Sequence, residues 1–220
     1  STTTGVVSNI GKWGFKIKTP PAGGPYSVRI NSGGNEIVLN DVMIGEVWLC
    51  SGQSNMEWSY YNGAKYIKEE LPECYNRNIR LFQIPRAASD YPQDDLKAEW
   101  KVCDSNSLKS FSAVGYYFGK KLQHDLNVPV GLINSSWGGT PAETWTPSET
   151  IFNNDVLKQA AAELKEVPWG PVKPGLNYNG MIAPITRYDI AGAIWYQGEA
   201  NVGTNSSYSQ LLMAMINSWR

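Results

Sequence analysis

The sequence predicts an α/β fold, a doubly wound parallel sheet preceded by part of a small β-sandwich region. Two observations support this prediction. From Val42 onward, short apolar segments alternate with amphipathic segments whose apolar residues recur every three or four positions, as strands and helices do around a parallel sheet. Three of the apolar segments end in polar, glycine-bearing motifs, and open α/β sheets bind their ligands at such ends.

Residues 1–41 form the first expected domain, part of a β-sandwich. They are rich in Gly, Pro and Thr, and their alternating segments predict strands near 14–19, 26–31 and 35–40. The sequence S-G-G-N at residues 32–35 predicts the turn of a hairpin between the last two strands. Because three strands cannot bury two faces, we expect part of this sandwich to lie outside the chain.

Residues 42–220 form the second expected domain, which carries the parallel sheet. Apolar runs bounded by turn residues predict its strands, and amphipathic periodicity predicts its helices. Strands are expected at 42–49, 79–84, 130–134 and 190–196, and helices at 60–71, 112–126, 155–166 and 207–219. Because the chain stops directly after a helix, we expect this domain to lack its C-terminal end.

The composition gives little support to nucleic-acid or membrane binding. The formal net charge is −1, charged residues make up 18%, and no block of like charges occurs. No apolar run approaches the roughly 20 residues that a membrane-spanning helix needs. Nine Trp and twelve Tyr fit either sugar stacking or core packing.

The three cysteines show no zinc-site spacing, and an odd number cannot close a disulfide framework. We therefore expect no metal and no cofactor. Cys50 lies in an apolar segment, which predicts a buried thiol. Whether Cys74 and Cys103 pair stays open.

Residues 47–58, V-W-L-C-S-G-Q-S-N-M-E-W, are the most informative segment. An apolar strand breaks at Gly52 and is followed by Ser54 at the start of a helical segment, where ester hydrolases hold a nucleophilic serine. The free N–H groups at the start of that helix would point toward the site. The alternative is structural, since Ser54 would cap the helix and Glu57 would complete a capping box.

Two further strand ends predict a shared pocket with Ser54. Gly138 and Gly139 follow the strand at 130–134, and a glycine lets a backbone N–H approach an oxyanion, although a simple tight turn is the alternative. Asn201 follows the strand at 190–196, and its side chain can donate an N–H to an oxyanion. The alternative is a polar loop in which Asn201 bonds to its own backbone.

Three motifs in order, C-S-G-Q-S-N-M-E-W, G-L-I-N-S-S-W-G-G-T-P-A-E-T-W and I-W-Y-Q-G-E-A-N, resemble the sialate O-acetylesterase family. This family belongs to the carbohydrate esterases of the SGNH-hydrolase superfamily. The resemblance covers residues 26–220 and implies a flavodoxin-like sheet. It implies a serine esterase that removes acetyl groups from acetylated sugars, either sialic acid or xylan-type glycans, in the periplasm or outside the cell.

The same resemblance implies a set of site residues, with Gly138 preferred over Gly139 as the amide donor. The nucleophile is Ser54, and the oxyanion donors are Asn201 and the N–H of Gly138 or Gly139. The residues that bind substrate or shape the pocket are Gln53, Asn55, Gln197 and Glu199.

The base of the family comes from an Asp-x-x-His motif that has no counterpart in these 220 residues. The single histidine, His124, projects away from the apolar stripe of its helix, so we expect it at the surface. The chain alone is expected to be a poor esterase, because a serine without a base is a weak nucleophile. A missing C-terminal segment or a second chain would complete the site.

Two other functions stay open. One is a glycan-binding module that keeps the pocket without hydrolysis. The other is a lipid or acyl-thioester hydrolase of the same fold, which the polar residues around the motifs favour less.

Overall fold

A computed structural model describes residues 2–9, 11–14 and 16–220 of the chain. The chain divides into two compact units, Ser1–Gly45 and Glu46–Arg220.

The first unit is built on one antiparallel hairpin. Strand β1 (Gly23–Ser32) pairs with β2 (Asn35–Ile44), and Ser32 lies opposite Asn35. Gly33 and Gly34 form the turn with φ angles of 55° and 85°, a left-handed geometry that glycine adopts without strain. The predicted turn is therefore confirmed.

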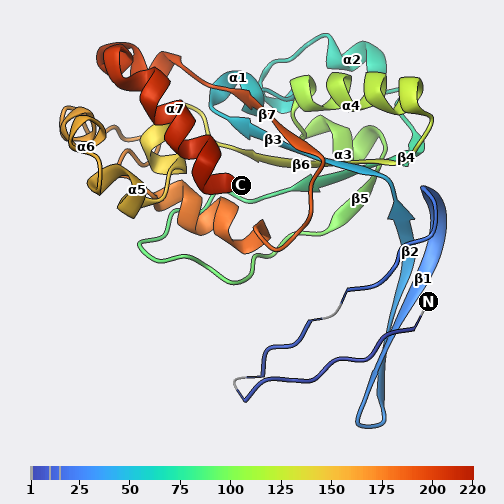
Figure 1. Ribbon diagram of the computed structural model, residues 1–220. Helices are drawn as coiled ribbons and strands as arrows, with labels where there is room; N and C mark the ends of the chain where they lie inside the picture. The colour runs from blue at the N-terminus through green and yellow to red at the C-terminus, as the bar shows by residue number, and fades with distance from the viewer. Residues whose placement is uncertain (1, 10, 15) are drawn as a thin grey trace. The chain divides into compact units, whose positions relative to one another are not determined.

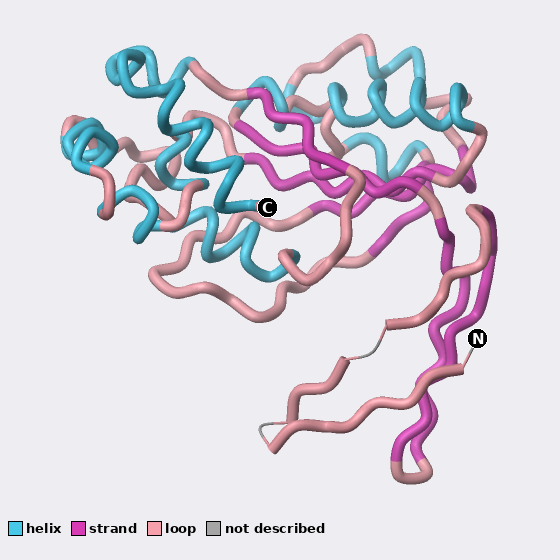
Figure 2. Tube along the Cα trace, in the orientation of Figure 1, coloured by secondary structure: helices cyan, strands magenta, loops and turns pink. Residues whose placement is uncertain are grey.

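The strand predicted at 14–19 is wrong. The described residues of that segment are loop, as Figure 2 shows for the chain before β1, and Phe15 lies outside the described residues. An alternating pattern forms a strand only where a neighbouring strand takes its backbone hydrogen bonds, and among the described residues this segment has none.

The second unit contains a five-stranded sheet in the order β5-β4-β6-β3-β7. Its strands are β3 (Glu46–Gly52), β4 (Asn76–Gln83), β5 (Trp100–Cys103), β6 (Val130–Ser136) and β7 (Gly192–Tyr196). Neighbouring strands are parallel, except that β5 runs antiparallel to β4 at one edge. The predicted α/β class is confirmed, whereas the short strand β5 was not predicted.

Helices cover both faces of this sheet (Figure 1). The α-helices are α1 (Ser54–Glu57), α2 (Ile67–Glu70), α3 (Ser105–Lys109), α4 (Ala113–Leu126), α5 (Ser148–Phe152), α6 (Asp155–Ala162) and α7 (Asn205–Trp219). The shorter turns are the 3₁₀ segments η1 (Tyr60–Asn62), η2 (Ala142–Trp145), η4 (Ala183–Ile185) and η5 (Glu199–Thr204), and the π-helical η3 (Tyr178–Ile182).

Successive residues of the central strands β3 and β6 pack into hydrophobic clusters on opposite faces of the sheet. Cys50 and Leu132 pack on the face covered by α3 and α4, with Phe111 and Tyr116. Leu49 and Ile133 turn to the opposite face, where they join clusters from η2, η3 and α7. Because strand side chains alternate, strands with both faces covered are apolar at every position, which explains their unbroken apolar runs.

Some predicted boundaries need correction. The strand expected at 42–49 is divided, because Val42 to Ile44 belong to β2 and β3 begins at Glu46. The helix expected at 60–71 is interrupted at Gly63, which has a left-handed φ of 99° and leaves only η1 and α2. The helix expected at 112–126 is confirmed as α4, capped by the Ser112 side chain, which accepts a hydrogen bond from Gly115 N at 3.0 Å.

Cys50, Cys74 and Cys103 are free and buried. Burial is the main reason that the pKa values of Cys50 and Cys103 both rise to about 12, so these thiols stay protonated at neutral pH. Cys50 therefore packs as an apolar side chain, as predicted. Among the helices of the described residues, none is both long enough and apolar enough to span a bilayer.

Candidate functional site

Ser54 lies beyond the carboxyl end of β3, at the first residue of α1, and it is exposed. The turn before it requires glycine. Gly52 has a φ of 142°, and a Cβ atom there would lie 2.2 Å from the backbone oxygen of Tyr196 on β7. The next residue, Gln53, donates its N–H to the same oxygen at 3.0 Å. Strand β7 thus fixes the bend that presents Ser54.

The capping-box interpretation of Ser54 is wrong. Gln53, and not Ser54, occupies the N-cap position of α1, and no side chain caps that helix. Glu57 does not bond back to the cap either, because its carboxylate faces residues from two other strand ends. Neither side chain therefore serves α1 as a cap.

Of the two candidate glycines, Gly138 lies next to Ser54. A Cβ atom at Gly138 would lie 3.4 Å from Ser54 Cβ and 3.0 Å from Glu57 Oε2. Gly139 has a φ of 74°, and its Cβ would lie 2.3 Å from Trp169 Nε1. Gly139 is thus required for the turn and for the close approach of the Trp169 ring, and Gly138 is the glycine that faces the serine.

Glu57 holds the strand ends around Ser54 together. Its Oε2 accepts the N–H of Gly138, after β6, at 2.8 Å. Both carboxylate oxygens bond to the guanidinium of Arg86, after β4, at 2.6 Å each. Arg86 also lies 5.6 Å from the centre of the Trp137 ring, within range of a cation–π contact. The sequence reasoning missed this ion pair, because nothing in the spacing of Glu57 and Arg86 indicates it.

Asn201 is only 2% exposed, and hydrogen bonds occupy its side chain. Its Nδ2 donates to Glu143 Oε2 at 2.8 Å and to Thr204 Oγ1 at 3.2 Å. Its Oδ1 accepts from Ala142 N at 2.9 Å and from Gln197 Nε2 at 2.7 Å. Asn201 therefore does not bond only to its own loop, since its bonds to Ala142 and Glu143 join η5 to η2. The oxyanion role of Asn201 stays a prediction.

Glu143, the partner of Asn201, is a buried acid. It is 1% exposed, and within the described part of the chain its Oε1 has no hydrogen-bond partner. Burial raises the pKa of this carboxyl, and the hydrogen bond from Asn201 opposes part of that rise.

The four predicted substrate-binding side chains divide into two pairs. Gln53 is 3% exposed, and its Oε1 accepts the N–H groups of Gly198 and Ala200 at 3.3 and 3.2 Å. Gln197 bonds through Nε2 to Asn201 Oδ1, as noted above, and through Oε1 to the Tyr208 hydroxyl at 2.7 Å. These contacts brace the loop after β7.

Asn55 and Glu199 form the second pair, which is more open to solvent. Asn55 Nδ2 donates to Glu199 Oε1 at 2.5 Å, between the segments that follow β3 and β7. Glu199 is exposed and Asn55 is half-buried, and Asn55 lines the pocket beside Ser54, so a substrate-binding role for this pair stays a prediction.

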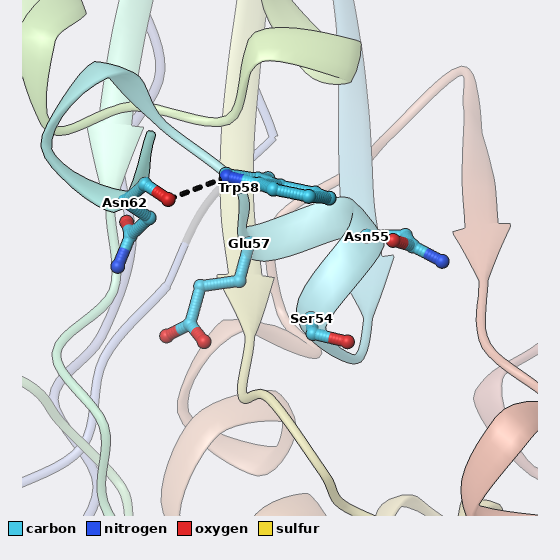
Figure 3. Close-up of a pocket in the computed structure, with 5 residues that line it drawn as sticks. All are labelled: Ser54, Asn55, Glu57, Trp58 and Asn62. Atoms are coloured by element: carbon cyan, nitrogen blue, oxygen red, sulfur yellow. Dashed lines mark hydrogen bonds between the residues drawn. The ribbon is translucent and has the colours of Figure 1, made fainter. Parts of the chain in front are cut away.

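A pocket of about 300 Å³ opens beside the serine, lined by Ser54, Asn55, Glu57, Trp58 and Asn62. Figure 3 shows Ser54, Asn55 and Glu57 projecting from α1 and the Trp58 indole with its nitrogen directed at Asn62. Its volume is at the lower end of the range for ligand pockets, roughly 300–1,000 Å³. In the part of the chain that the structure describes, no group of three or more acidic, Cys or His side chains could hold a metal ion.

His124 is remote from this pocket. Its side chain is 84% exposed and lies 3.2 Å from Asp125, which confirms the predicted surface position. Helix α4 begins beside α1, where Ala113 N bonds to Trp58 O, and it runs away toward the start of β6. At 1.5 Å per residue, the eleven residues from Ala113 place His124 about 16 Å along that axis.

Comparisons with known proteins identify the family of this chain. Residues 44–220 match the family described as carbohydrate esterase, sialic acid-specific acetylesterase. The sialate O-acetylesterases of Homo sapiens and Pongo abelii are each 32% identical over 230 residues, which cover 99% of this chain and 44% of each relative. The chain thus spans less than half the length of these relatives.

A solved structure gives the same result. The crystal structure of a carbohydrate acetylesterase from Xanthomonas citri aligns with a TM-score of 0.81 at 34% identity, over 96% of this chain and 46% of that one. The family match extends over most of the chain and includes all three strand ends that surround Ser54. This chain therefore belongs to the carbohydrate esterase family of sialic acid-specific acetylesterases.

Proposed function

We propose that this chain carries the nucleophile-bearing site of a serine O-acetylesterase that removes acetyl groups from acetylated sugars. The observation that carries this proposal is the exposed hydroxyl of Ser54, beside Gly138, in a pocket at the carboxyl edge of the sheet. Family membership favours an acetyl ester of a sugar over a lipid ester or an acyl thioester. Acetylated sialic acid and xylan-type glycans are the two proposed substrates.

The proposed reaction has two steps. Ser54 Oγ attacks the acetyl carbonyl carbon, and the bond from that carbon to the sugar oxygen breaks, so that the sugar leaves with the serine proton. Water then attacks the acetyl-serine, which releases acetate and returns the proton to Ser54. Each step passes through an oxyanion that needs hydrogen-bond donors.

We propose the Gly138 N–H as the first oxyanion donor, in preference to Gly139, because Gly138 faces Ser54. In the present arrangement this N–H donates to Glu57, so the bond must open or be shared when the oxyanion forms. The proposed second donor, Asn201 Nδ2, would likewise have to leave Glu143.

The proposed base lies outside the described site. His124 is remote and exposed, so it cannot take the Ser54 proton. We therefore propose that the 220 residues alone are a weak esterase, and that a histidine from a further segment or a second chain completes the site. Residues 1–41 are proposed to belong to a β-sandwich region, distinct from the catalytic domain at 42–220.

Labelling with a fluorophosphonate, which phosphonylates activated serines, tests the role of Ser54. Labelling should be slow, confined to Ser54 and absent in Ser54→Ala. Added imidazole should accelerate it, because a free base then replaces the missing one. The His124→Ala chain should label at the unaltered rate. Labelling that persists in Ser54→Ala would show that Ser54 is not the nucleophile. Slower labelling of His124→Ala would show that His124 acts as the base.

A non-catalytic glycan-binding module is the second candidate. The hydrogen bond between the Gly138 N–H and Glu57 favours it, since a charged acceptor already occupies the proposed oxyanion donor. Sugar binding together with no labelling of Ser54, even with imidazole present, would support this candidate.

A further inference from the structure

Trp58 is held rigidly yet remains partly open to solvent. Its backbone oxygen accepts the Ala113 N–H at 2.9 Å, and its indole Nε1 donates to Asn62 O at 2.6 Å (Figure 3). Asn62 is fixed in turn by the Ser59 hydroxyl, 2.6 Å from Asn62 Oδ1. Trp58 is nevertheless 46% exposed. A ring that is already fixed costs a ligand little conformational entropy on binding.

The indole and the serine belong to the same short segment. Trp58 directly follows α1 (Ser54–Glu57), four residues after Ser54. Both residues line the same pocket beside α1. A sugar ring on the indole therefore lies within reach of Ser54 through a short substituent such as an acetyl ester.

The chemistry of the lining suits a sugar. The indole N–H is satisfied by Asn62, so the ring offers its apolar surface, while Ser54, Asn55 and Glu57 add polar groups around it. A pyranose has this same division, with C–H groups on its ring face and hydroxyls at its edge. An acyl chain would need a continuous apolar lining, which these five residues do not provide.

We infer that the Trp58 indole is the stacking subsite for the pyranose ring that carries the acetyl ester. The inference rests on the proposed function, because it assumes that the ester of this ring is the group presented to Ser54. It assigns to Trp58 a role in affinity and orientation and no role in proton transfer.

The test is a titration of the Ser54→Ala chain, which cannot turn the ligand over, with the methyl glycoside of an O-acetylated xylopyranose. The indole N–H signals are followed by NMR, and Trp58→Phe assigns the signal of Trp58 among the nine tryptophans. We expect the ligand to shift this signal. Because the Trp58 variants lack it, affinities of the parent and the variants are measured by isothermal titration calorimetry. Trp58→Ala should bind about tenfold more weakly and Trp58→Phe within about threefold of the parent, because a smaller ring still stacks.

Tyr61→Ala is the matched control, since Tyr61 is an exposed aromatic residue three positions away that does not line the pocket. Its affinity should stay at the parent value. Equal binding by Trp58→Ala, no binding by the parent, or a loss that follows Trp169→Ala instead would each overturn the inference. The proposed function fails separately, since an unreactive Ser54 is compatible with a sugar complex that depends on Trp58.

Discussion

The ends of β3 and β7 lie side by side, with Gly52 paired to Tyr196, and the proposed catalytic side chains that follow them, Ser54 and Asn201, differ in exposure. After β3, Ser54 is exposed and lines a pocket. After β7, Asn201 is 2% exposed and donates to Glu143. Both segments carry the same kind of sequence signal, which is a glycine and several polar residues directly after an apolar strand.

The difference lies in what the neighbouring elements supply. The segment η2 packs beside the end of β7 and brings Ala142 N and Glu143 to Asn201, which can therefore be buried at little cost. Within the described part of the chain, no such element covers Ser54, which is exposed. A polar strand end thus becomes a ligand site only where the rest of the chain leaves its groups open.

The largest expected effect is that of Gly52→Ala. The added Cβ would lie 2.2 Å from the Tyr196 oxygen, at a φ of 142° that L-residues rarely adopt. We expect a loss of about 3 kcal/mol or more in the free energy of unfolding, measured by urea denaturation. Gly203→Ala, in η5 after β7, is the control, because a Cβ there meets nothing within 4 Å and should change stability by less than about 0.5 kcal/mol. If the two variants lose the same stability, contact with Tyr196 on β7 is not what requires glycine at position 52.

Asn201→Ala should have the next largest effect, and it separates the two strand ends directly. The substitution leaves Ala142 N and Glu143 Oε2 without a buried partner, while Gln197 Nε2 keeps its bond to Thr140 O; we expect a cost of about 2–3 kcal/mol in the free energy of unfolding. Ser54→Ala should cost less than about 0.5 kcal/mol by the same measurement, because Ser54 is exposed. If Ser54→Ala proves the more destabilising change, the contrast between the two ends is wrong.

Much of the fold could be predicted from the sequence, because local patterns decided it. The α4 prediction was accurate in its bounds, since Ser112 caps the helix and Val114, Phe118 and Leu122 of the predicted stripe pack against the core. The last stripe residue, Leu126, is exposed instead. Strand β5 was missed because it is four residues long and pairs only with β4 at a sheet edge. The strand predicted at 14–19 was wrong for a related reason, since this segment of alternating residues has no partner strand among the described residues.

The candidate site was predicted only in part, because its side chains bond to residues that are far away in the sequence. The exposure of Ser54 and the proximity of Gly138 follow from parallel strands ending at one edge. The pairing of Glu57 with Arg86, 29 positions away, and of Asn201 with Glu143, 58 positions away, depends on side-chain packing between loops. No local pattern contains that information, so a capping role for Glu57 stayed open as an alternative until the structure was known.

The smallest expected effect concerns the pH dependence that Glu143 gives to the end of β7. Burial raises the pKa of this carboxyl in the folded chain, so the folded state keeps its proton at pH values where the unfolded state has lost it. The stability that comes from this group is therefore complete below the unfolded pKa of about 4.3 and is lost as pH rises through the raised folded value.

Glu143→Gln should remove this loss, because a neutral amide keeps an acceptor for Asn201 Nδ2 and carries no charge to bury. Urea unfolding from pH 4 to pH 8 should show the variant gaining stability relative to the parent as pH rises. Glu149→Gln, at an exposed glutamate on α5, should follow the parent throughout. If the difference between Glu143→Gln and the parent is independent of pH, Glu143 does not titrate as a buried acid, and the end of β7 is more open than its hydrogen bonds imply.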